Sequence, residues 1–187
     1  MSGRLLYNLL ALLWVAIMVS GCSGWPARQR DSMETTLPQS TSELQEWASR
    51  QARRYPGRSG MLLLGSGTDA LDARLSLIDR ARRSIDVQYY LIKDDLVGRA
   101  FINALLKAAD RGVRVRLLLD DIFTSGYDAG MAALHAHPNF EIRIFNPFNR
   151  GGLGAAVSAV TNFSRINRRM HNKSFTIDNQ ATIIGGR

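Results

Sequence analysis

The feature that most constrains the fold is an alternation of strand-like and helix-like segments between residues 84 and 145. Three short stretches have apolar residues at every second position, which is typical of half-buried strands: 85–91, 113–119 and 140–145. Apolar residues three and four apart predict the helices that separate them, 97–111 and 127–135. Because this order requires crossover connections, we predict an α/β fold with a mostly parallel sheet and helices on both faces.

Two further helices are predicted upstream of this run. Ser42 and Gln45 have the Ser-x-x-Gln spacing of a capping box, and Pro56-Gly57 ends the helix that they start. Trp47 in that helix is expected to pack into the core rather than to insert into a membrane. Thr68 is expected to cap the second helix, in which apolar residues recur at spacings of three and four.

A motif that carries chemistry stands near the C-terminal end of the sequence. His171, Lys173 and Asp178 follow the order His-x-Lys-x-x-x-x-Asp, and six residues separate Asp178 from the pair Gly185-Gly186. Side chains two positions apart in an extended segment point the same way, so His171 and Lys173 share one surface. Asp178 has the opposite parity, and we expect it to support the strand rather than to contact a substrate.

An imidazole beside a fixed ammonium suits attack on a phosphodiester. Imidazole is a nucleophile or proton carrier near neutral pH, and the ammonium offsets charge that develops on the non-bridging phosphate oxygens. An isolated His-x-Lys pair usually lies on a solvated edge strand. The spacing of the whole motif, with Asp178 and the pair Gly185-Gly186, favours the catalytic interpretation. We predict a hairpin over 174–177 and 181–184, after which Gly185 and Gly186 let the backbone approach a phosphate or a partner strand.

The motif resembles the HKD signature of the phospholipase D superfamily. The run 167–173 looks most like cardiolipin synthases of the C type, and the resemblance extends upstream through 112–121 and 84–90 to about Tyr55. It implies a phospholipase D-like fold in which one motif's His attacks phosphorus and forms a phosphohistidine. The other motif's His protonates the leaving alcohol. The family works without a metal, and no cofactor is implied.

The sequence contains one such motif, whereas the family usually carries two in one chain. We therefore expect the first half of a longer protein, truncated after Arg187, whose second motif comes in cis or from a second copy. His171 is either the nucleophile or the general acid. The predicted function is phosphatidyl transfer between phospholipids. The alternatives are a phosphodiesterase or nuclease of the same fold that acts as a homodimer, and an inactive truncated membrane lipoprotein.

The charge of the chain favours anionic partners. There are 24 Lys and Arg residues against 16 Asp and Glu residues, a net charge of +8, which suits phospholipid head groups, nucleic acid or a membrane surface. The basic excess leads into the motif, where Arg169 is expected to bind substrate phosphate. Gln88 is a second candidate for substrate binding, and residues 150–170 are expected to shape an entrance for lipid. Phospholipids are the expected substrates, and nucleic acid is not an expected partner.

Acidic pairs follow two of the predicted strands. Asp94-Asp95 and Asp120-Asp121 stand at carboxyl ends, where the ligand sites of parallel sheets lie. Adjacent carboxylates could bind Mg²⁺ there, but they serve equally well as turn formers and helix starters. The sequence has no further His, Asp or Glu cluster that supports a metal, so we predict no metal site.

The N-terminal residues predict export to the cell envelope. Arg4 precedes an apolar run over 5–19, and the small residues that end on Cys22 resemble a bacterial lipobox. Cys22 is the only cysteine, so no intrachain disulfide can form. We expect a signal peptide over 1–21, a lipidated Cys22 on a flexible tether over 22–41, and a phospholipase D-like domain over 42–187. The alternative is an uncleaved anchor.

The expected location is a membrane that faces the periplasm. Ser23 after the cysteine, rather than Asp, favours the outer membrane over the inner membrane if the cell is Gram-negative.

Overall fold

The computed structural model describes residues 41–147 and 168–186. These residues lie in one compact unit of the chain. The predicted signal peptide, Cys22, nearly all of the tether and most of the predicted lipid entrance lie outside the described residues. Within the described part, no helix is both long enough and apolar enough to cross a membrane.

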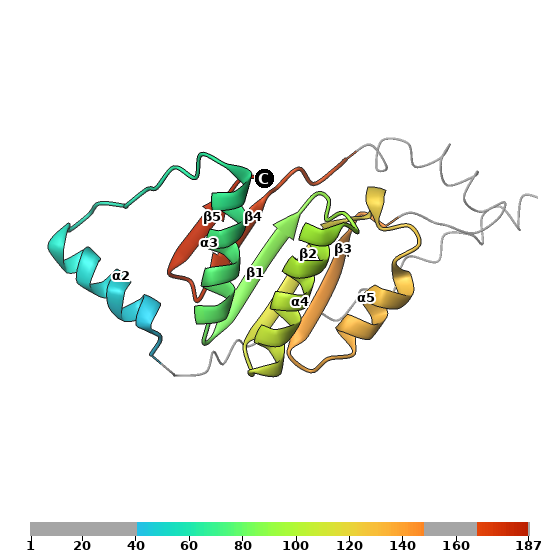
Figure 1. The fold of residues 1–187 in the computed structure, drawn as a ribbon, viewed down its shortest axis with the longest axis horizontal. Helices are drawn as coiled ribbons and strands as arrows, with labels where there is room; N and C mark the ends of the chain where they lie inside the picture. The colour runs from blue at the N-terminus through green and yellow to red at the C-terminus, as the bar shows by residue number, and fades with distance from the viewer. Residues whose placement is uncertain (1–40, 148–167, 187) are drawn as a thin grey trace, which may run out of the picture. The chain divides into compact units, whose positions relative to one another are not determined.

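A mixed sheet of five strands lies at the centre of the described part, in the order β3-β2-β1-β4-β5. The strands are β1 (Ser84–Tyr89), β2 (Arg114–Asp120), β3 (Phe140–Phe145), β4 (Ser174–Ile177) and β5 (Ala181–Ile184). β1, β2 and β3 pair in parallel, while β4 pairs antiparallel with β1 and β5 antiparallel with β4. β4, which lies between Lys173 and Asp178 of the motif, is therefore directly beside β1, and β5 lies at the edge of the sheet (Figure 1).

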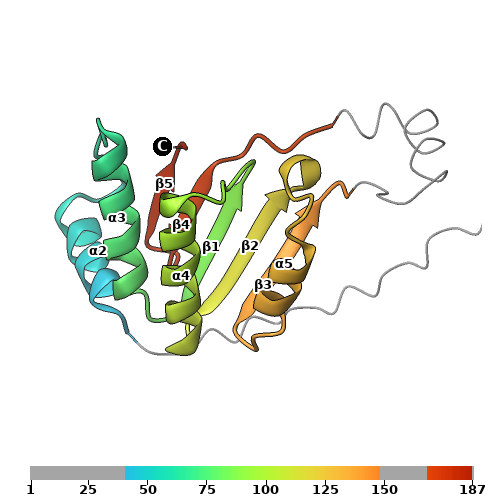
Figure 2. The ribbon, with the colours of Figure 1, turned by 45° about the vertical axis from the view of Figure 1, so that its right-hand side comes forward.

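The helices are α2 (Glu43–Arg54), α3 (Gly67–Arg80), α4 (Leu96–Asp110) and α5 (Asp128–His135), with a single 3₁₀ turn, η1 (Asp121–Phe123). Figures 1 and 2 show α3, α4 and α5 side by side over one face of the sheet. The predicted α/β fold is confirmed. The sheet is mixed and not mostly parallel, because β4 and β5 join β1 as an antiparallel hairpin. Among the described helices, α3 to α5 cover this one face.

The core fills the space between this face of the sheet and the helices. Phe101 and Leu105 of α4 pack onto the alternate residues of the strands that the sequence pattern marked as apolar. The ring of Phe101 lies 5.8 Å from that of Tyr89 and 5.9 Å from that of Phe175, centroid to centroid. Phe175 is fully buried, so a residue within the motif forms part of the same core as the parallel strands.

Two predictions about the upstream helices are wrong. Trp47 is 51% exposed, because α2 buries none of its residues and contacts the core mainly through Leu44. The cap of α3 is Ser66, whose hydroxyl accepts a hydrogen bond from the backbone N–H of Asp69 at 3.0 Å. Thr68 lies inside the helix, with its hydroxyl 2.9 Å from that of Ser66. The predicted cap at Ser42 is confirmed by the bond from Gln45 N–H, at 3.1 Å.

Candidate active site

The motif lies where its extended segment passes the carboxyl end of β1. The imidazole of His171 contacts the ring of Tyr90 edge to face, with 4.4 Å between centroids. The ammonium of Lys173 lies 6.0 Å from the centroid of the same ring. Tyr90 also packs edge to face against Phe123, at 5.4 Å between centroids. His171 is exposed and Lys173 is half-buried, so both sit around one aromatic ring within reach of solvent.

The two glycines hold the backbone and the side chain of Lys173. Gly185 N–H donates to the carbonyl of Lys173 at 2.9 Å, and Gly185 has φ +110°, a conformation that favours glycine. A Cβ on Gly186 would overlap Cδ of Lys173, so a larger residue there would force the lysine side chain to move. The backbone at Gly185 and Gly186 thus makes the predicted close approach, and the group that it approaches is Lys173. Contact with a phosphate stays a prediction.

Arg74 of α3 binds the carbonyl of Gly185 in the glycine turn, a role that was not predicted from the sequence. Its side chain is buried, at 4% exposure. Its guanidinium donates to the carbonyl of Gly185 at 2.8 Å, to the hydroxyl of Tyr89 at 2.7 Å and to the carbonyl of Ala70 at 2.6 Å. The signal was present in the sequence, because Arg74 stands four residues before Ile78 on the apolar face of the helix.

Asp178 binds backbone amides and lies away from the exposed surface of the motif. Its side chain is 2% exposed. One carboxylate oxygen accepts from the N–H groups of Arg83 and Ser84 at 2.8 and 2.9 Å, and the other accepts from Arg82 N–H at 3.1 Å. These bonds fix the first residues of β1 against the β4–β5 turn. The expectation that Asp178 supports a strand is confirmed.

Asp120 ties the end of β2 to the residues just before His171. It is 1% exposed, and its carboxylate accepts from the N–H of Met170 at 2.9 Å and from the guanidinium of Arg169 at 3.0 Å. A third bond, from Ile122 N–H at 3.0 Å, starts the η1 turn. Arg169, which the sequence predicts to bind phosphate, is thus paired with a buried carboxylate. A contact with substrate stays a prediction.

Gln88, the other residue predicted to bind substrate, forms a hydrogen bond with Asn172 of the motif. Its side-chain oxygen accepts from the amide of Asn172 at 3.0 Å. The cause is the strand register, in which Gln88 pairs with Ser174. Binding of substrate by Gln88 stays a prediction.

The acidic pair after β1 serves the start of α4. Asp95 is the N-cap of the helix and accepts from Gly98 N–H at 2.8 Å. Asp94 pairs with Arg99, whose guanidinium lowers the pKa of the Asp94 carboxyl from its ordinary value through a hydrogen bond. Within residues 41–147 and 168–186, no group of three or more His, Cys, Asp or Glu side chains could hold a metal ion.

The fold and the motif together define a phospholipase D-type domain. The family model described as "Cardiolipin synthase, PLD-like domain" matches residues 75–187, and the chain belongs to this family. The resemblance seen in the motif is confirmed.

The chain is also similar to individual proteins. The chain is 50% identical to cardiolipin synthase C of Escherichia coli (strain K12) over 134 residues, which cover 72% of this chain and 28% of that protein. It is 41% identical to an uncharacterized protein of Helicobacter pylori (strain ATCC 700392 / 26695), over 74% of this chain and 28% of that one. Among solved structures, NucT from Helicobacter pylori has a TM-score of 0.47 at 20% identity, over 67% of this chain and 70% of that chain. The chain thus spans little more than a quarter of the length of the curated relatives.

Proposed function

We propose that the chain supplies one half of a site for phosphatidyl transfer between phospholipids. The observation that carries the proposal is that the imidazole of His171 and the ammonium of Lys173 lie around one ring, that of Tyr90. A nucleophile or proton carrier and a fixed positive charge can then face the same phosphodiester. Membership of a family described by cardiolipin synthase supports phospholipid as the substrate.

The proposed reaction has two steps and uses the imidazoles of two motifs. In the first step an imidazole nitrogen bonds to phosphorus, and the bond from phosphorus to the leaving oxygen breaks as the second imidazolium protonates that oxygen. In the second step the neutral second imidazole takes the proton of an acceptor alcohol, whose oxygen bonds to phosphorus while the P–N bond breaks. His171 fills one of these two roles. Lys173 offsets the charge on the non-bridging oxygens in both steps.

Removal of either proposed catalytic side chain should abolish most of the transfer. His171→Ala and Lys173→Ala should each lower the rate by roughly 10²-fold or more, because positioned proton transfer and charge stabilisation each contribute on that order. Neither side chain is fully buried, so the fold should persist. The measurement, made at concentrations where the chain is dimeric, is the conversion of two molecules of phosphatidylglycerol to cardiolipin and glycerol. Circular dichroism is the check of folding.

Lys107→Ala is the matched control, because Lys107 is an exposed lysine on α4 far along the sequence from the motif. It should transfer at the wild-type rate. Wild-type transfer by His171→Ala would contradict the proposal. Cleavage of DNA by the wild-type protein, without transfer between lipids, would favour the phosphodiesterase alternative.

We also propose that the protein is a lipoprotein of the cell envelope, anchored through Cys22 and facing the periplasm. The support is the basic start, the apolar run and the small residues before Cys22. Cys22→Ser should release the protein from membranes or block removal of residues 1–21, whereas Ser23→Ala should do neither. The measurement is membrane fractionation with radioactive palmitate. A wild-type chain that stays unlabelled would contradict the proposal.

A further inference from the structure

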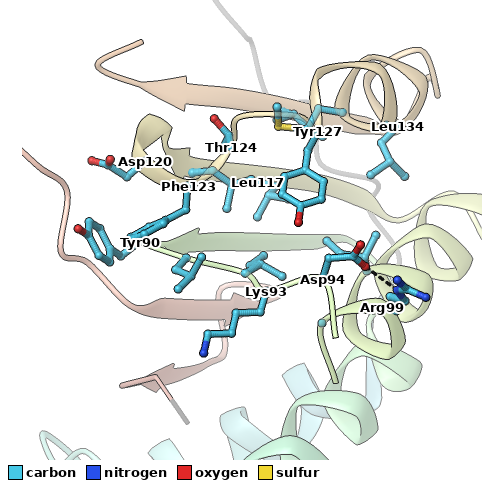
Figure 3. A pocket seen from close by; sticks show the side chains of 18 of the residues that line it. Tyr90, Lys93, Asp94, Arg99, Leu117, Asp120, Phe123, Thr124, Tyr127 and Leu134 are labelled. Carbon is cyan, nitrogen blue, oxygen red and sulfur yellow. Dashed lines mark hydrogen bonds and ion pairs between the residues drawn. The ribbon is translucent and has the colours of Figure 1, made fainter. Parts of the chain in front are cut away.

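An apolar pocket of about 470 Å³ lies between α4, α5 and the sheet. Its walls are aliphatic side chains from all three of these parts: Ile102, Leu106, Leu117, Leu119, Leu134 and Ile142. Figure 3 shows the rings of Tyr90 and Phe123 at one end of the pocket and Leu134 toward the other. This volume falls in the range of small-molecule sites, roughly 300–1,000 Å³.

The pocket and the candidate active site share one side chain. Tyr90 lines the pocket and also contacts the imidazole of His171 and the ammonium of Lys173. Phe123, which packs on Tyr90, lines the same end. A phosphate held by His171 and Lys173 would therefore lie close to the apolar pocket, because the Tyr90 ring borders both.

Most of the wall is apolar and favours an apolar occupant, although polar side chains also line the pocket: Lys93, Arg99, Asn103, Thr124 and Tyr127. Two carboxylates line the pocket, and both have partners: Asp94 is paired with Arg99, and Asp120 accepts from Arg169 and from Met170 N–H. A sugar or a nucleobase would leave its own polar groups unpaired against the aliphatic walls, which costs free energy. A hydrocarbon chain has no such groups and gains from each methylene that leaves water.

We propose that this pocket takes one acyl chain of the phospholipid whose phosphate lies at His171 and Lys173. The position of the phosphate in this inference rests on the proposed function. The position of the acyl chain rests on the pocket alone. Tyr90 then contacts both parts of the substrate, because its ring lies beside His171 and Lys173 and also lines the pocket.

The test is the dependence of binding on acyl chain length in the full chain that carries His171→Ala, so that no turnover interferes. The probes are lysophosphatidylglycerols with one acyl chain of increasing length, titrated below their micelle concentrations by calorimetry. Affinity should rise by roughly fourfold per methylene as the pocket fills, the value expected for buried methylenes, and then reach a plateau.

Gly130 allows the pocket to be filled without disturbing the core. It lines the pocket from α5, and a Cβ at this position would meet no atom within 4 Å. We therefore expect the acyl chain length at which affinity stops rising to fall progressively from Gly130→Ala to Gly130→Leu to Gly130→Trp. Gly67→Trp is the matched control, because Gly67 is also a helix residue with an open Cβ position and does not line the pocket. It should leave the plateau unchanged.

The outcomes distinguish a failure of the acyl pocket from a failure of the proposed function. If affinity does not depend on chain length, or if Gly130→Trp and Gly67→Trp give the same plateau, the acyl pocket is wrong, whatever the transfer assay shows. If the plateau shifts with Gly130→Trp while dimeric samples of the wild-type protein transfer no phosphatidyl group, the pocket stands and the proposed function falls. A melting temperature for Gly130→Trp equal to that of Gly67→Trp shows that the shift comes from filling and not from unfolding.

Discussion

At the scale of single residues, the three members of the motif divide into two kinds. His171 and Lys173 lie around the ring of Tyr90 within reach of solvent, whereas the carboxylate of Asp178 accepts three backbone bonds in the interior. A buried anion that is held by N–H donors stabilises the fold, because those donors would otherwise be unpaired. The acid of the motif is thus a structural residue for the hairpin that directly follows His171 and Lys173.

Asp178→Asn should destabilise the protein while it preserves the shape of the side chain. The amide group would place N–H donors against the backbone N–H groups of residues 82–84, at a cost of about 2–3 kcal/mol. The measurement is unfolding in urea. Asp72→Asn, at an exposed position of α3, is the control and should change stability by less than about 0.5 kcal/mol. Equal stabilities of the two variants would contradict this role.

At the scale of elements, the site depends on bonds between parts that are far apart in the sequence. Asp120 at the end of β2 holds the backbone before His171, and Arg74 of α3 holds the turn after β5. Gly185 N–H in turn bonds to the carbonyl of Lys173. Two elements therefore position the motif from opposite ends.

Arg74→Met should loosen the glycine turn more than it weakens the whole fold. Methionine fills the space of the side chain but leaves the Gly185 carbonyl without its donor. We expect the protection of Gly185 N–H against hydrogen exchange to fall by roughly tenfold, which corresponds to the loss of one hydrogen bond of about 1.4 kcal/mol. Arg80→Met, at an exposed position of the same helix, is the control. Unchanged protection of Gly185 in Arg74→Met would show that the bond does not hold the turn.

The elements themselves were largely predictable from the sequence, because strand alternation and helix spacing are local patterns. The strand Phe140–Phe145 and both strands of the hairpin have the predicted bounds. The predictions for Trp47 and Thr68 were wrong, and none was made for Arg74. The surroundings of Trp47 and Arg74 depend on how α2 and α3 pack, whereas Ser66 and Thr68 are two residues apart and either could have capped α3. From the sequence, an arginine on an apolar helix face could be an exposed residue that interrupts the apolar pattern or a buried hydrogen-bond donor. Only the position of the Gly185 carbonyl distinguishes these two interpretations.

At the scale of the whole molecule, the sequence carries one His-x-Lys-x-x-x-x-Asp motif and a net charge of +8. The proposed reaction needs two imidazoles, one to bond phosphorus and one to protonate the leaving oxygen. A single copy of the chain supplies one of them at His171. Loss of the general acid alone lowers such a reaction by roughly 10²–10⁴-fold.

The most direct test of this half-site account is a dilution series on which sedimentation and phosphatidyl transfer are measured together, for the wild-type chain and for His171→Ala. The account predicts almost no transfer in monomeric samples, transfer per chain that rises with the fraction of dimer, and none from His171→Ala at any concentration. Full specific activity in a strictly monomeric wild-type sample would contradict it, because one motif would then suffice.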